Sequence, residues 1–265
     1  MAKHLLAYEN ALTSTSSFTK MTPASDTLVY VDGTNKTVQV PQTNLLVAAY
    51  SYGANFLLAQ IQTPSLKANR VPIEWGEMDT TATQPINTVG AIPPLQYFGD
   101  TPIPLQIGEP LEVDYTGGGT AVGTVGVWLS DGNPGLKVSG NFLPGVRATS
   151  ATTLTANAWT TCSLTFDNQL PAGGYAVVGM EAFSATGVLA RVALPGSGFR
   201  MGVIAGPITV STRDRLFRAG RFANTVPGTY ESWGAFVSTA PPQVEFFAGA
   251  ADTSEIVYLD LVKVA

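Results

Sequence analysis

The chain has 265 residues, of which 45% are hydrophobic and only 12% are charged, and its formal net charge is −5. Soluble proteins usually carry about 25% charged residues. We therefore expect much of the surface to be covered by other subunits, the alternative being a neutral β surface rich in Ser and Thr. The acidic balance argues against a globally basic nucleic-acid-binding protein, and the single cysteine, Cys162, excludes an internal disulfide.

The start of the chain predicts an N-terminal arm and no targeting segment. The apolar positions of residues 1–12 suit a short amphipathic helix, and residues 13–25 are rich in Ser and Thr, like a loop. The chain start has no long apolar run and carries Glu9, so we expect no signal peptide. No apolar run approaches the length of about 18 residues that a membrane-spanning helix requires. These features predict synthesis in a cytoplasm.

From Asp26 onward the apolar residues recur with a period of two, which predicts β-strands. Asp32-Gly33 between Leu28–Val31 and Val38–Val40 is typical of a tight hairpin turn. The 27 glycines and 18 prolines are spread along the chain, as expected for many short strands joined by turns. Helix is expected only at residues 1–12 and 213–219. Further strands are expected at residues 45–52, 56–62, 111–115, 124–129, 162–166, 175–183, 188–194, 243–247 and 256–264.

The two halves of the chain resemble each other at a nearly constant offset, which is close to half the chain length. Three sets of residues carry the repeat. Ala49–Ser51 matches Ala182–Ser184, and Leu57–Ile61 with Pro64 matches Val188–Val192 with Pro195. Pro110, Val125, Val127 and Leu129 match Pro242, Val257, Leu259 and Leu261. The repeat predicts a duplicated all-β unit, with the boundary inside residues 140–156.

Each repeat has a size that suits eight short strands, as in a jelly-roll β-sandwich. We therefore expect an all-β chain of two tandem eight-stranded jelly rolls with a short N-terminal helical arm. The expected parts are an arm at residues 1–25, a first roll at 26–145 and a second roll at 146–265. An immunoglobulin-type sandwich is the architectural alternative, although the single cysteine removes its usual disulfide.

Few residues could carry catalysis. His4 is the only histidine, so a Ser-His-Asp triad or a His/Cys zinc site would have little to draw on. Neighbouring acids, such as Glu112 and Asp114 on one strand face, leave a glycosidase or a Ca²⁺ site as alternatives. The glycine-rich residues 117–123 lack the Gly-Lys-Ser/Thr ending of a phosphate loop and suit a hairpin turn. We expect no enzymatic activity, cofactor or metal.

The charged residues are separated along the chain. Residues 191–221 hold six arginines and one acid, and residues 71–114 hold seven acids and no Lys or Arg. Because Arg suits planar, partly buried pairing with carboxylates, we expect the Arg segment of one subunit to meet the acidic segment of its neighbour. The alternatives are a contact with nucleic acid or anionic lipid, and a contact within the chain. The candidate interface residues are Arg191, Arg200, Arg213, Arg215, Arg218, Arg221, Glu74, Glu77, Asp79, Glu109, Glu112 and Asp114.

The tandem repeated sets resemble, in architecture, the double jelly-roll major capsid proteins of tailless icosahedral viruses, including bacteriophages. The resemblance implies a structural virion subunit, made in the host cytoplasm, that assembles into an icosahedral shell through pseudo-hexameric homotrimers. It implies minor capsid or vertex proteins as partners and no small-molecule substrate. It also implies an inward N-terminal helix, here residues 1–12, near an inner membrane or the genome. The alternatives are a tandem carbohydrate-binding module and a spike, cementing or tail protein of a virion.

Overall fold

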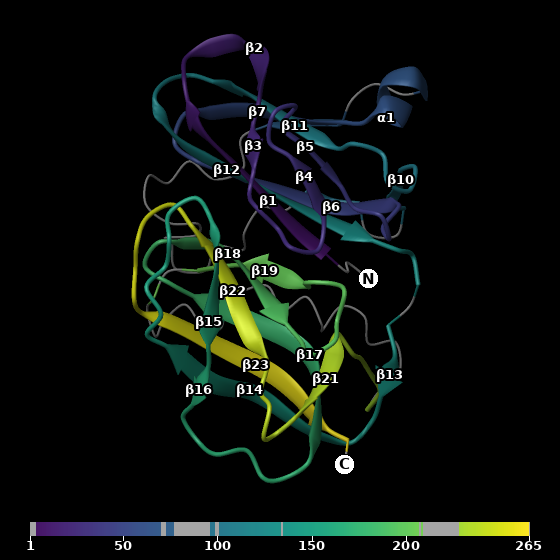
Figure 1. The fold of residues 1–265 in the computed structure, drawn as a ribbon, viewed down its shortest axis with the longest axis vertical. Helices are drawn as coiled ribbons and strands as arrows, with labels where there is room; N and C mark the ends of the chain where they lie inside the picture. The colour runs from purple at the N-terminus through teal and green to yellow at the C-terminus, as the bar shows by residue number, and fades with distance from the viewer. Residues whose placement is uncertain are drawn as a thin grey trace. The chain divides into compact units, whose positions relative to one another are not determined.

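The computed structural model describes residues 4–69, 73–76, 96–98, 101–133, 135–206, 208 and 228–264. These residues fall into two units, the first ending at Gly132 and the second beginning at Asn133 (Figure 1). Strands dominate both, as the sequence predicts, and within the described residues the one helix is α1, Pro64–Asn69. That helix is too short and too polar to span a membrane.

The first unit is a pair of antiparallel sheets. One sheet has the strand order β10-β6-β12-β1-β3, and β9 also pairs with β6. The other has the order β2-β11-β7-β8. The hairpin β4-β5 lies at the position where Asp32-Gly33 predicts one. The strand bounds are β1 His4–Leu12, β2 Thr15–Lys20, β3 Thr22–Pro23, β4 Tyr30–Asp32, β5 Thr37–Gln39, β6 Leu45–Tyr52, β7 Phe56–Gln62, β8 Ile73–Gly76, β9 Gln96–Tyr97, β10 Ile103–Pro104, β11 Glu112–Gly117 and β12 Ala121–Ser130.

The second unit is built in the same way. One sheet has the order β16-β14-β23-β17-β21 and the other the order β15-β22-β18-β19, while β13 pairs with β20. The strand bounds are β13 Lys137–Val138, β14 Asn141–Ser150, β15 Trp159–Ser163, β16 Thr165–Phe166, β17 Gly174–Phe183, β18 Gly187–Ala193, β19 Gly202–Ile204, β20 Tyr230–Glu231, β21 Gly234–Val237, β22 Gln243–Ala248 and β23 Glu255–Lys263.

Both units share one strand order. Eight strands of each unit can be numbered in chain order, β1, β2, β6, β7, β8, β10, β11, β12 in the first and β14, β15, β17, β18, β19, β21, β22, β23 in the second. In each unit one sheet then contains the order 1-8-3-6, and the other has the order 2-7-4-5. The closing strand, β12 or β23, therefore lies between the first and the third strand in both units.

The strand register also matches between the units. Val113 pairs with Ile61 in the first unit, and Val244 pairs with Val192 in the second. The distance along the chain from Val113 to Val244 equals that from Ile61 to Val192, so the pair is repeated as a whole. Val127 pairs with Ala49, and Leu259 pairs with Met180. The counterpart of Ala49 is thus Met180, so the sequence match of Ala49–Ser51 with Ala182–Ser184 is two residues out of register. Moving a strand by two residues leaves the same side chains on the same sheet face. The alternation of apolar residues therefore fits the observed register and the register two residues away equally well.

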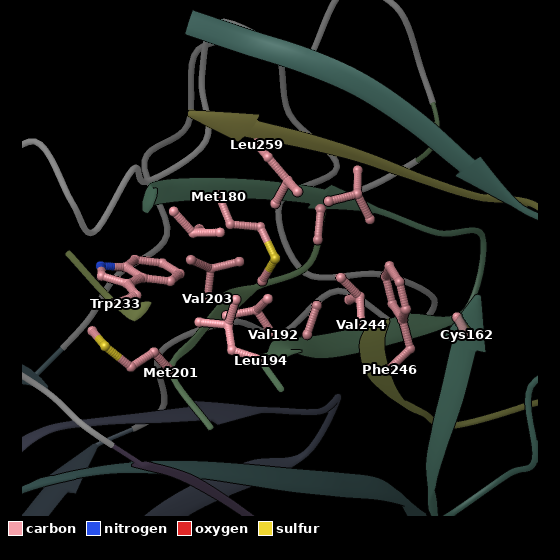
Figure 2. Packing of buried hydrophobic residues seen from close by; sticks show 14 of the residues in the cluster. Cys162, Met180, Val192, Leu194, Met201, Val203, Trp233, Val244, Phe246 and Leu259 are labelled. Carbon is pink, nitrogen blue, oxygen red and sulfur yellow. The ribbon is translucent and has the colours of Figure 1, made fainter. Parts of the chain in front are cut away.

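Each unit has its own apolar core between its two sheets. In the first unit alternate residues of β1, β6, β7, β11 and β12 point inward, with Tyr8, Phe56 and Tyr115 among the largest fully buried side chains. In the second unit Met180, Val192 and Val244 pack from three different strands, with Phe246 and Trp233 beside them (Figure 2). Burying side chains of this size contributes roughly 1.5–3 kcal/mol each.

The expectation of an N-terminal helix is wrong, because residues 4–12 form strand β1. All nine residues of β1 pair with β12, from His4 with Leu129 to Leu12 with Ala121. Leu5 and Ala7 are buried as well as the inward-facing Leu6 and Tyr8. Burial of both faces removes the alternation that identifies a strand in sequence, and the remaining pattern resembled a helix. The expected membrane or genome contact of residues 1–12 depended on that helix.

Several further strands were not expected from the sequence, among them β2 and β14, which belong to the strand order that both units share. Thr15–Lys20 forms β2 and pairs with β11, although its Ser- and Thr-rich composition predicted a loop. Asn141–Ser150 forms β14, which pairs with β23 inside the segment that the repeat suggested as a boundary. Both are strands whose side chains are partly exposed, so tertiary pairing decides their structure more than hydrophobic pattern does.

Candidate assembly surface

The acidic residues of β11 form a polar cluster centred on Glu112. Val113 and Tyr115 point into the core, so Glu112 and Asp114 share the outer face of the sheet β2-β11-β7-β8. Glu112 is salt-bridged to Lys20 of β2 and to Lys67 of α1. Burial alone would raise the pKa of Glu112, but the hydrogen bonds and charges of the two lysines lower it. Glu112 is thus ionised and neutralised by cations of its own unit.

Asp114 differs from Glu112 although it lies only two residues away. Its carboxylate accepts a 2.5 Å hydrogen bond from Gln62 of β7, and Gln62 also donates to Gln60 at 2.5 Å. The pKa of Asp114 is raised, first by burial and then by the negative charge of Glu112. The sequence correctly placed this pair of acids on one face. Their partners are lysine and glutamine side chains, which stabilise the sheet.

Glu109 holds helix α1 against the segment that leads into β11. Its carboxylate accepts hydrogen bonds from the Ser65 N–H at 2.9 Å, the Ser65 hydroxyl at 2.7 Å and the Gln106 N–H at 2.7 Å. Thr63 caps the start of the helix, because its hydroxyl accepts the Leu66 N–H at 3.2 Å, and Pro64 occupies the first helical position. The sequence proposed Glu109 as an interface residue, and its contacts described here lie within the first unit.

Arg191 lies on the outer face of β18 in a buried polar cluster. Its guanidinium Nε donates to Glu245 of β22 at 2.6 Å, and its Cζ lies 4.0 Å from the centroid of the Trp159 ring. The Arg191 side chain is only 3% exposed. Arg200 also approaches Glu245, at 3.6 Å, and donates to the carbonyls of Ser197 and Phe199. The carboxylate between the two arginines therefore comes from the second unit itself.

Seven candidates of the charge pattern remain. Arg213, Arg215, Arg218, Arg221, Glu77 and Asp79 lie outside the described residues, as does the expected helix at 213–219. Glu74 belongs to β8, where its backbone pairs with Gln60. The structure therefore brings together Glu112 with Asp114 in the first unit, and Arg191 with Arg200 in the second.

The two residues best suited to nucleophilic or acid-base chemistry are buried in separate places. His4 Nε2 lies 3.1 Å from Asp26 Oδ2, and both side chains are at most 2% exposed. Cys162 is in the core of the second unit, where burial and then the charge of Glu255 raise its pKa to about 11. Among the described residues no group of three or more His, Cys, Asp and Glu side chains could hold a metal ion.

The sequence did not predict that the acids Glu9 and Glu255 are buried or that the apolar side chain of Ile107 is exposed. Glu9 and Glu255 are at most 7% exposed, and burial is the main cause that raises the pKa of each to about 7. Ile107 is 68% exposed in the turn before β11. The available signal for Ile107 was an apolar residue followed by glycine in the run Gln-Ile-Gly-Glu-Pro, which is typical of a turn and not of a core strand.

No protein-family model matches this chain, and no curated protein matches it in sequence. Among solved structures, the crystal structure of the major capsid protein P2 from bacteriophage PM2 is similar over 98% of each chain, with 8% identity and a TM-score of 0.22. A TM-score this low carries no argument about fold or function. The strand order and register of the two units are the relevant observations.

Proposed function

We propose that this chain is a structural subunit of a virus capsid, of the major capsid type, that assembles with copies of itself. The observation that carries the proposal is the shared strand order, 1-8-3-6 and 2-7-4-5, in two successive units. This is the order of an eight-stranded jelly roll, in which two sheets are joined by Greek-key connections. The matching register, with counterparts at a constant offset along the chain, supports a duplication of one roll.

A duplicated roll suits the tiling of a shell. Each chain supplies two similar blocks, so three chains would form a pseudo-hexameric trimer with six similar blocks around a centre. Closed rings require heterologous contacts, in which two different surfaces of the chain meet. Stable interfaces bury about 1,200–2,000 Å², and a chain with 12% charged residues has the neutral surface that such burial favours.

The contacts of the charged residues refine the proposal for the subunit interface. Glu112 is neutralised by Lys20 and Lys67, and Glu245 accepts Arg191. These ion pairs stabilise each roll internally. Pairing between neighbouring subunits would then fall to the charges of residues 74–79 and 213–221. Reversing Arg215 and Arg218 to Glu should weaken assembly most at low salt, because exposed ion pairs are screened as the ionic strength rises.

The proposal is tested by measuring the mass and the shape of the purified full-length protein. Light scattering after size-exclusion chromatography should give trimers or larger closed particles, and negative-stain electron microscopy should show blocks of pseudo-six-fold outline or shells. A matched sample in mild urea, in which assemblies dissociate before the rolls unfold, should return to the 27.8 kDa monomer. A native chain that stays monomeric at every concentration and binds glycans would overturn the proposal in favour of a carbohydrate-binding module.

A further inference from the structure

We draw no further inference here: the strongest candidate, the surface of the sheet β2-β11-β7-β8 in the first unit with the exposed apolar side chains of Phe18 and Leu58, carries nothing because nothing in the structure shows what covers it.

Discussion

Ser65 donates both its backbone N–H and its hydroxyl to the carboxylate of Glu109, at 2.9 and 2.7 Å. These two contacts join residues 44 positions apart and fix two neighbouring segments at once. Helix α1 is held so that Leu66 reaches the core, and the turn that carries Ile107 is held in one conformation. The same carboxylate thus fixes two segments of the first unit at once.

Replacing Glu109 with Gln should lower the free energy of unfolding by about 1 kcal/mol at pH 7, because hydrogen bonds to a carboxylate are lost or weakened. Burial alone would raise the pKa of Glu109, but its hydrogen bonds with Ser65 and Gln106 lower it overall. Its stabilising effect is therefore present above the ordinary pKa of 4.5 and lost as the pH falls through the lowered value. Urea denaturation between pH 7 and pH 3 checks this: the difference between the two proteins should be largest at pH 7 and should shrink as the pH falls below 4.5.

Arg191→Met should destabilise the second roll by about 3–5 kcal/mol, because the Glu245 carboxylate would lose its closest cation in a buried place. Arg191→Met combined with Glu245→Gln should recover much of the loss, since the uncompensated charge is then removed. Arg191→Lys should recover less, because an ammonium group lacks the planar contact over Trp159. Chemical denaturation of the wild type, Arg191→Met, Glu245→Gln and the double variant as a double-mutant cycle measures the coupling, and Arg191→Lys is measured beside them. Additive losses would show that the pair is not coupled.

Glu255→Gln should make the second roll less sensitive to pH. Burial, and then the nearby charge of Asp252, raise the pKa of Glu255 from 4.5 to about 7, against weaker backbone hydrogen bonds that lower it. The folded state holds this proton more tightly than the unfolded state, so the wild type loses stability as the pH rises from about 4.5 to about 7. The variant should lack this loss and be the more stable protein above pH 7. Melting temperatures between pH 4 and pH 8 test this, and identical profiles would contradict it.

Cys162 should be unreactive in the folded protein. Its side chain is fully buried and its thiol pKa is about 11, so very little thiolate exists at neutral pH. A thiol reagent at pH 8 should label the native chain at the slow rate of unfolding and label the denatured chain at once. Fast labelling of the native chain would show that this side of the core opens.

The sequence alone predicted that this protein is built from strands and that its two halves resemble each other, and both units have the same strand order. Alternating apolar residues located β6 and β7 to the residue, and the offset of Val188–Val192 from Leu57–Ile61 agrees with the observed pairing register. β6 is buried on both faces and was found as an apolar run of strand length. A period of two is visible where one sheet face is buried and the other is polar. The pair of acids on β11 was found for the same reason.

Tertiary contacts determine which strands lack a visible side-chain period of two, and they determine which partner each charged side chain contacts. β1 is buried on both faces over most of its length, and its pattern resembled a helix. β2 and β14 are strands because β11 and β23 supply their hydrogen-bonding partners. The ion pairs of Glu112 and Arg191 depend on strands that are distant in sequence. The counterpart segments after β7 and β18 also differ, since one forms helix α1 and the other a tight turn in which the Ser197 N–H donates to the Leu194 carbonyl.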